Sequence, residues 1–93
     1  MRRRFRIIAT PDPQALPRII GVFAQRSLIP AMLSARRQGD VLHIAADFDD
    51  LDPTMASIIA GKLCETVLVA EVSCDPVDDP ASAGALRTVR LAS

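Results

Sequence analysis

Apolar residues recur at every third or fourth position in two stretches of this chain, a spacing typical of amphipathic helices. The first stretch follows the Pro-Asp-Pro turn at residues 11–13 and runs to about Gln25 or Arg26. Its apolar positions are Leu16, Ile19, Ile20 and Phe23. In the second stretch, after Pro53, they are Met55, Ile58, Ile59 and Leu63. We therefore expect two helices, each burying one face.

Four shorter stretches fit β-strands, over residues 5–10, 29–37, 41–48 and 67–74. The third alternates most regularly. One of its faces carries Leu42, Ile44, Ala46 and Phe48, and the other carries Val41, His43, Ala45 and Asp47. Gly39 takes a positive φ at little cost, so the turn at residues 38–40 joins the second and third strands into a hairpin. Pro30 cannot donate to a ladder, which predicts that the second strand lies at an edge.

The order of elements is β-α-β-β-α-β. Right-handed crossovers and the central hairpin turn this order into a four-stranded antiparallel sheet with both helices on one face. The first and third strands are expected at the centre, and the second and fourth at the edges. The open face is expected to carry Ile8, Val41, Ala45 and Val69, with Arg6 and His43 among them. Such a partly apolar face in a small domain favours pairing with another chain, and an exposed edge strand offers a second way to dimerise.

The start of the first helix is a candidate ligand site. Asp12 is expected as the N-cap with Pro13 at the first helical position. Pro17 leaves two alternatives, because either the first turn is irregular or the regular helix begins nearer Leu16. Backbone N–H groups left free around Gln14 could hold the carboxylate of a small ligand. The second helix has a clearer start, with Asp52 as N-cap.

The charged residues suggest two further sites, and neither is our preferred interpretation. The basic start, Arg2 to Arg6, fits a phosphate or nucleic-acid contact, or else a solvated approach to the first strand. The formal net charge is zero, so we expect the latter and no nucleic-acid partner. An acidic cluster fits a hard-cation site, or else helix capping and solvation. Its members are Asp47, Asp49, Asp50 and Asp52, and because the glycine and glutamate of a calcium loop are missing, we expect no metal.

Several other classes are disfavoured. His43 is the only histidine, and no nucleophile or carboxylate is clearly placed as its partner, so we expect no catalytic residues and no cofactor. Cys64 and Cys74 are expected as reduced thiols. No secretory or membrane-spanning stretch is visible, which predicts a cytoplasmic protein without a membrane partner.

The 93 residues fit one small domain. Residues 1–74 are expected to form it. Residues 75–93 are rich in Asp, Pro, Ala and Ser and are expected to form a tail. Within them, residues 86–91 suit a short fifth strand or an annealing arm.

The first helix resembles that of ACT domains, most of all those of the small regulatory subunit of acetohydroxyacid synthase (acetolactate synthase). That family has a Leu-x-Arg-[hydrophobic pair]-Gly-[hydrophobic]-Phe-x-x-Arg pattern. The matching residues are Leu16, Arg18, Ile19, Ile20, Gly21, Phe23 and Arg26. Residues 62–72, with Lys62-Leu63, Val67, Val69 and Val72, resemble the family's second helix and fourth strand. The resemblance covers residues 5–74 and implies a ferredoxin-like α+β sandwich of the ACT type.

The chain departs from this family at the positions that hold an amino acid. Members that bind a branched-chain amino acid typically have Asn-x-Pro-Gly, where this chain has residues 11–14, Pro-Asp-Pro-Gln. A second ligand asparagine falls on Ile29. The positions of a bound effector would be Asp12, Gln14, Ala15, Leu16 and Ile29.

The resemblance therefore implies a short, feedback-insensitive small subunit that lacks the C-terminal domain of longer regulatory subunits. Such a subunit supports a large catalytic subunit that uses thiamine diphosphate, in branched-chain amino-acid biosynthesis, and does not sense valine. We also expect a homodimer, because an ACT-type pocket forms between two chains. The alternative is a free-standing ACT-like homodimer that binds an amino acid or another small ligand.

Overall fold

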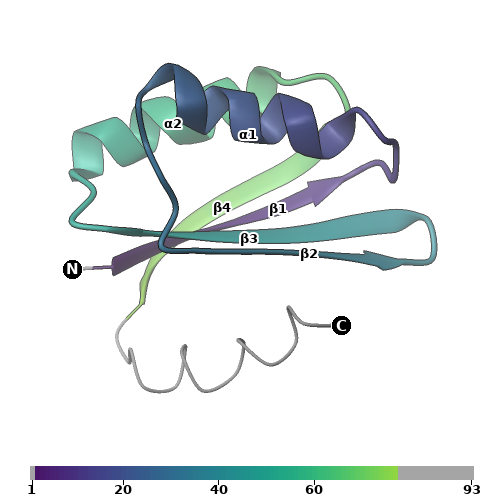
Figure 1. The fold of residues 1–93 in the computed structure, drawn as a ribbon, viewed down its shortest axis with the longest axis horizontal. Coiled ribbons are helices and arrows are strands. Elements are labelled where there is room, and N and C mark those ends of the chain that lie inside the picture. The colour runs from purple at the N-terminus through teal and green to yellow at the C-terminus, as the bar shows by residue number, and fades with distance from the viewer. Residues whose placement is uncertain (1, 78–93) are drawn as a thin grey trace.

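The computed structural model describes residues 2–77, which form four strands and two helices (Figure 1). In chain order these are β1 (Arg2–Ala9), α1 (Ala15–Gln25), β2 (Met32–Gln38), β3 (Val41–Asp49), α2 (Pro53–Glu65) and β4 (Val69–Val77). The predicted βαββαβ order is confirmed. The tail segment at residues 86–91, expected as a strand or an arm, lies outside the described residues.

The strands form one antiparallel sheet in the order β2-β3-β1-β4. The first and third strands are therefore central, as predicted. Both helices pack on the same side of the sheet, and no other described element covers its second side (Figure 1). We call this second side the open face. Alternation along β1 buries Phe5, Ile7 and Ala9 under the helices and turns Arg2, Arg4, Arg6 and Ile8 toward the open face.

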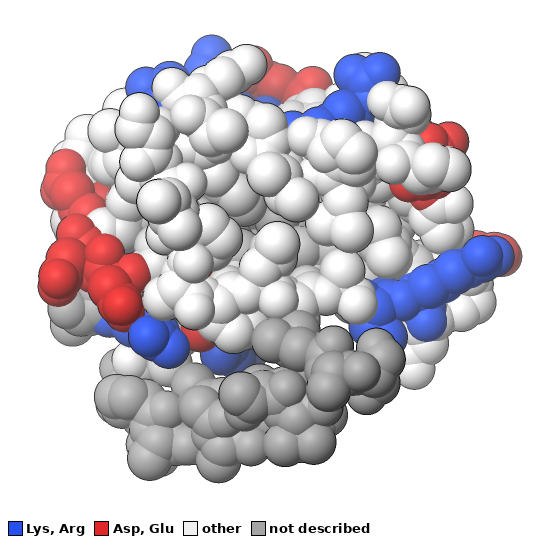
Figure 2. Space-filling model, in the orientation of Figure 1, with Lys and Arg blue, Asp and Glu red and all other residues white. Residues whose placement is uncertain are grey.

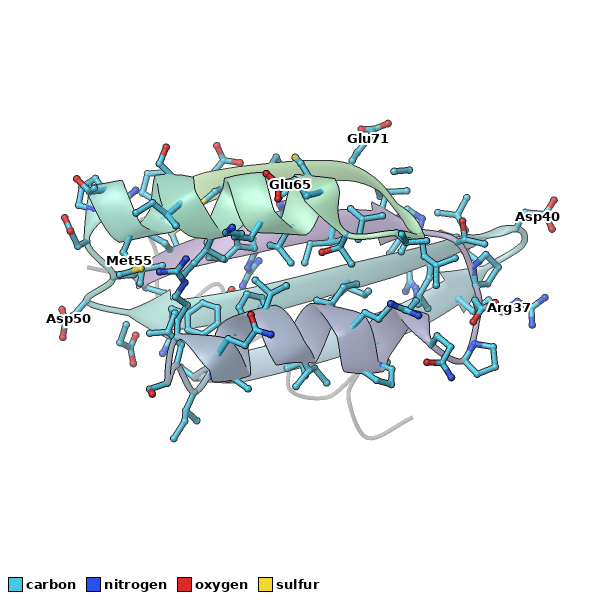
Figure 3. All side chains as sticks on the ribbon, turned by 90° about the horizontal axis from the view of Figure 1, so that it is seen from above. Arg37, Asp40, Asp50, Met55, Glu65 and Glu71 are labelled. Carbon is cyan, nitrogen blue, oxygen red and sulfur yellow. The ribbon has the colours of Figure 1, made fainter. Side chains whose placement is uncertain are left out.

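The core lies between the helices and the sheet and is built around three phenylalanines. The ring centroids of Phe23 and Phe48 are 4.8 Å apart, and Phe5 lies 6.0 Å from Phe23 and 5.8 Å from Phe48. Figure 3 shows the two helices side by side above the sheet. Edge-to-face and tilted contacts of this kind add to the free energy gained by burying the rings.

The two predicted apolar stripes are partly wrong. On α1 the buried residues are Ala15, Ile19 and Phe23, whereas Ile20 is 42% exposed. On α2 they are Ala56, Ile59 and Leu63, whereas Ile58 is 40% exposed. A helix on a sheet buries a narrow row of positions, so only one isoleucine of each adjacent pair faces the core.

The starts of the two helices differ. Asp52 caps α2 as predicted, since its side chain accepts a hydrogen bond from the Thr54 N–H and Pro53 occupies the first helical position. For α1 the prediction is wrong, because the N-cap is Gln14 and the helix begins at Ala15. Pro17 thereby becomes the third helical residue, where an N–H has no partner within the helix. Of the two alternatives that Pro17 left open, the structure therefore shows the second, in which the regular helix begins nearer Leu16.

The strand boundaries also differ from the prediction, most of all at three places. β1 begins at Arg2, so the basic start belongs to the strand. β2 begins at Met32, which leaves Pro30 just before the edge strand. β4 runs on to Val77, through residues assigned to the tail. The pairing of β1 with β4 shifts by one residue, because Ile8 pairs with Glu71 and Ala9 pairs with Val69. Val69 therefore faces the core, and its predicted place on the open face is wrong.

Within residues 2–77, neither helix is long and apolar enough to cross a membrane.

Candidate functional site

Asp12 holds the turn between β1 and α1 through its side chain and its backbone. The Asp12 carboxylate accepts a hydrogen bond of 2.8 Å from the Gln14 N–H, and its carbonyl oxygen accepts one of 2.9 Å from the Ala15 N–H. This is the arrangement in which an aspartate closes a turn on its own backbone. The N–H groups of Gln14 and Ala15, which were expected to be free for a ligand carboxylate, thus already donate to Asp12.

Only Leu16 keeps a free N–H at this helix start among residues 2–77, since Pro17 has none. A carboxylate bound here would have one backbone donor in place of three. Displacing the Asp12 side chain from Gln14 would release a second donor, at the expense of the turn's own hydrogen bond.

The structure brings four of the five effector positions together and leaves the fifth apart. Asp12, Gln14, Ala15 and Leu16 lie at the start of α1, whereas Ile29 follows its end. The eleven residues of α1 separate the two ends by about 16 Å, given a rise of about 1.5 Å per residue. Ile29 is 88% exposed. Within one chain these five positions therefore cannot surround one small ligand.

The side of the molecule formed by α1 and β2 has few charged side chains at its centre (Figure 2). Ile20 on α1 and Ile29 in the following loop are exposed. Partly buried leucines of the same elements lie beside the core, namely Leu16, Leu28 and Leu33. Within the described residues, β2 pairs only with β3, so its outer backbone edge is unused. We call this the α1–β2 side; it combines the two features that favour contact with another chain, exposed apolar area and an unpaired edge.

The acidic cluster is taken up by structural interactions. Arg4 binds Asp47 through two hydrogen bonds of 2.6 and 2.9 Å, and Arg2 binds Asp49 through one of 2.9 Å. Asp52 caps α2. Residues 2–77 contain no group of three or more acidic, histidine or cysteine side chains placed to hold a metal ion.

These ion pairs shift the pKa values of their members. The hydrogen bond to Asp47 raises the pKa of Arg4. The hydrogen bond from Arg2 lowers the pKa of Asp49 below its usual value. The interpretation of Arg2 to Arg6 as a solvated approach is therefore wrong for its first members, which are paired strand residues.

Sequence reasoning missed these pairs although their spacing signals them. In the antiparallel pairing of β1 with β3, Arg2 lies opposite Asp49 and Arg4 lies opposite Asp47. An arginine at every second position of one strand and an aspartate at every second position of the other is the pattern expected for cross-strand ion pairs. The two cysteines are free thiols, as predicted, and burial raises the pKa of the Cys74 thiol.

Comparison with known proteins decides the family. The sequence matches the family model of the ACT-like domain over residues 1–81. The chain belongs to the ACT-like domain family. ACT domains are regulatory, ligand-binding modules without catalytic residues of their own. Among proteins of curated function, none matches this sequence significantly.

Solved structures share the ACT-like fold. The ACT domain of GTP pyrophosphokinase from Chlorobium tepidum is 12% identical with a TM-score of 0.71, over 81% of this chain and 97% of that one. The C-terminal domain of MgtC from Mycobacterium tuberculosis is 13% identical with a TM-score of 0.65, over 83% and 87%. The regulatory subunit of aspartate kinase from Thermus thermophilus is 15% identical with a TM-score of 0.61, over 81% and 50%. At these identities the likeness is one of fold.

Proposed function

We propose that this ACT-like domain is a non-catalytic regulatory or stabilising small subunit of acetohydroxyacid synthase in branched-chain amino-acid biosynthesis, and that it does not sense valine. The motif that resembles this family, from Leu16 to Arg26, lies on α1. The apolar positions of this motif divide between the core and the exposed surface, since Ile19 is buried and Ile20 is exposed. The exposed part is available to a partner chain.

The observation that carries the insensitivity to valine is the use of Asp12 as a turn-closing residue. An effector amino acid needs donors for its carboxylate and acceptors for its amino group. Here Asp12 takes the N–H groups of Gln14 and Ala15, and its negative charge repels a second carboxylate. The position that would hold an amide in family members that bind an effector is Ile29, which cannot hydrogen-bond through its side chain.

Reconstitution tests this proposal. The chain is co-expressed with a large thiamine-diphosphate subunit, and complex formation, synthase activity and inhibition by valine are measured. We expect the two chains to copurify, the activity to rise, and valine to have no effect. Absence of both copurification and activation would refute the proposal, and inhibition by valine would refute the insensitivity alone.

A matched pair of variants locates the contact. Ile20→Glu places a charge on α1 within the α1–β2 side, and Ile58→Glu places one on α2 at nearly the same exposure, 42% against 40%. We expect Ile20→Glu to weaken association with the large subunit at least tenfold, because a charge is desolvated at the contact. Ile58→Glu should leave it unchanged. Equal loss in both variants would argue against the α1–β2 side.

A second candidate is a free-standing homodimer that binds an amino acid or another small ligand. The unused edge of β2 favours it, since pairing of two β2 edges would continue the sheet. A second copy is also the only way to bring an Ile29 near an Asp12. Light scattering gives the oligomeric state and calorimetry gives binding to a panel of amino acids. A monomer, or a dimer that binds none of them at millimolar concentration, would count against this candidate.

A further inference from the structure

The open face of the sheet carries four arginines, and only two of them are neutralised. Arg2 and Arg4 are bound by Asp49 and Asp47. Arg6 on β1 and Arg36 on β2 have no hydrogen bond or ion pair with any residue from 2 to 77. Both are exposed. Two arginines without an ion pair, on the same side of one sheet, can bind an anion.

Register places these arginines around one small residue. Arg6 lies directly opposite Ala45 in the pairing of β1 with β3. Arg36 lies opposite His43, which precedes Ala45 by two positions on the same face of β3. Diagonal neighbours on a sheet face are about 7–8 Å apart, within reach of long side chains. Arg6, His43 and Arg36 are therefore neighbours of Ala45 in the register of the open face, and the residue between them carries only a methyl group.

Two serines lie in the same row of the open face. Ser34 on β2 lies opposite Ala45, and Ser73 on β4 lies opposite Arg6, so one row across the sheet reads Ser34, Ala45, Arg6, Ser73. Ser34 is partly buried and Ser73 is exposed. Ser34 thus adds a hydroxyl donor beside Ala45. Ser73 lies three strands away from Ser34, about 14 Å at about 4.8 Å per strand, and does not reach the same small anion.

We propose that this part of the open face, which we call the Ala45 site, binds the phosphate group of a small molecule. A phosphate offers three or more acceptor oxygens, enough for two guanidinium groups and a hydroxyl group that approach it from neighbouring strands. A guanidinium binds two of them at once. A carboxylate offers only two oxygens and would leave part of this donor set unused. The zero net charge of the chain favours a small phosphate compound over a nucleic acid.

Three carboxylates lie near the site and limit its affinity. Asp47 follows Ala45 by two positions on β3 and is bound by Arg4, and on β4 Asp75 lies opposite Arg4 and Glu71 opposite Ile8. Glu71 is therefore a diagonal neighbour of Arg6. It forms no ion pair with Arg6, and Figure 3 shows it at the outer edge of β4, directed away from the sheet. Removing its charge should strengthen binding, because a like charge near the anion disappears.

The site is testable with inorganic phosphate and pyrophosphate as probes. The full chain is titrated with each at low ionic strength, and amide shifts are followed by NMR. We expect saturable shifts in β1, β2 and β3 around Ala45, with tighter binding of pyrophosphate. Arg6→Gln and Arg36→Gln should each weaken binding about tenfold, whereas Arg18→Gln, which removes an exposed arginine from α1 on the other side of the sheet, should not.

Two further variants sharpen the result. Arg6→Lys keeps the charge and loses the planar fork, so its affinity should fall between those of the wild type and Arg6→Gln. Glu71→Gln should bind more tightly than the wild type. Circular dichroism verifies that each variant is folded, as expected for exposed positions.

Three outcomes would overturn the proposal. The first is no saturable shift with either probe at millimolar concentration. The second is equal weakening by Arg18→Gln and Arg6→Gln, which would mean unspecific attraction. The third is binding of a single-stranded oligonucleotide without binding of phosphate or pyrophosphate, which would assign the face to a nucleic acid.

Discussion

Arg4 and Asp47 face each other across the pairing of β1 with β3, and the planar guanidinium donates two hydrogen bonds to the carboxylate, of 2.6 and 2.9 Å. The Asp47 side chain is 1% exposed although it lies on the face away from the helices. Its backbone oxygen also accepts a hydrogen bond from the Ala31 N–H, just before β2 begins. Asp47 therefore connects β3 to β1 through its side chain and to the residue before β2 through its backbone.

Breaking this pair should be costly. In Arg4→Met the buried Asp47 carboxylate loses its bidentate partner, and we expect the free energy of unfolding to fall by about 3–5 kcal/mol. In the double variant Arg4→Met with Asp47→Leu no charge is left unpaired, so much of this loss should be recovered. Urea denaturation of the two single variants and the double variant measures both effects.

Arg2→Met is the matched control. It removes the neighbouring arginine, whose main partner Asp49 has a side chain that is 59% exposed. Exposed ion pairs contribute little, and we expect a loss of less than about 1 kcal/mol. Similar losses for Arg2→Met and Arg4→Met would contradict the distinction between the buried and the exposed pair.

The adjacent isoleucines of α1 should behave differently on truncation. Ile19 is fully buried beneath the helix, so Ile19→Ala should lower the free energy of unfolding by about 2–5 kcal/mol. Ile20→Ala removes a side chain that keeps 42% of its exposure and should cost less than about 1.5 kcal/mol. Thermal or urea unfolding of the two variants gives the comparison, and a reversed order would place the other face of α1 on the sheet.

The Arg2–Asp49 pair makes stability depend on acid pH. Folding lowers the pKa of Asp49 through the hydrogen bond from Arg2. The stabilisation is therefore present above the pKa of the unfolded chain, about 3.9, and is lost as the pH falls through the lower folded value. An NMR titration of the Asp49 carboxyl carbon should give a midpoint below that of a free aspartate. In Arg2→Gln the midpoint should return upward; an unchanged midpoint would reject the pairing.

The two thiols should react at different rates. Burial raises the pKa of Cys74, so less thiolate is present at mildly alkaline pH, whereas Cys64 is exposed. We expect a disulfide reagent to modify Cys74 more slowly than Cys64, measured separately in Cys64→Ser and Cys74→Ser. Because folding favours the neutral Cys74 thiol, its contribution to stability is present below the unfolded pKa and is lost as the pH rises through the raised value. Equal rates would show that Cys74 is accessible.

The architecture follows from the sequence because each element carries its own local signal. The regular alternation of β3, the glycine turn before it and the Asp52-Pro53 start of α2 each depend on a few neighbouring residues. The βαββαβ order then leaves few ways to connect the strands. The order of the elements and the sheet topology can therefore be predicted without knowing which distant residues are in contact.

The details that the sequence did not predict depend on contacts between distant segments. Whether Asp12 caps the helix or closes the turn before it depends on where α1 meets the sheet. The inward position of Val69 follows from a bulge in β4, and the exposure of Ile20 follows from which row of α1 positions meets the sheet. The ion pairs of Arg2 and Arg4 appear only once β1 is aligned with β3. The candidate effector positions were read from a motif and remain a prediction.

The pairing of Arg2 with Val77 puts the first and last described strands next to each other at one end of the sheet. Polypeptide leading into such a unit and polypeptide leading out of it pass the same corner. A fold with this property can be spliced between two segments of a host protein, or doubled in tandem, without stretching either linker. A domain of this kind can therefore be inserted into different host proteins.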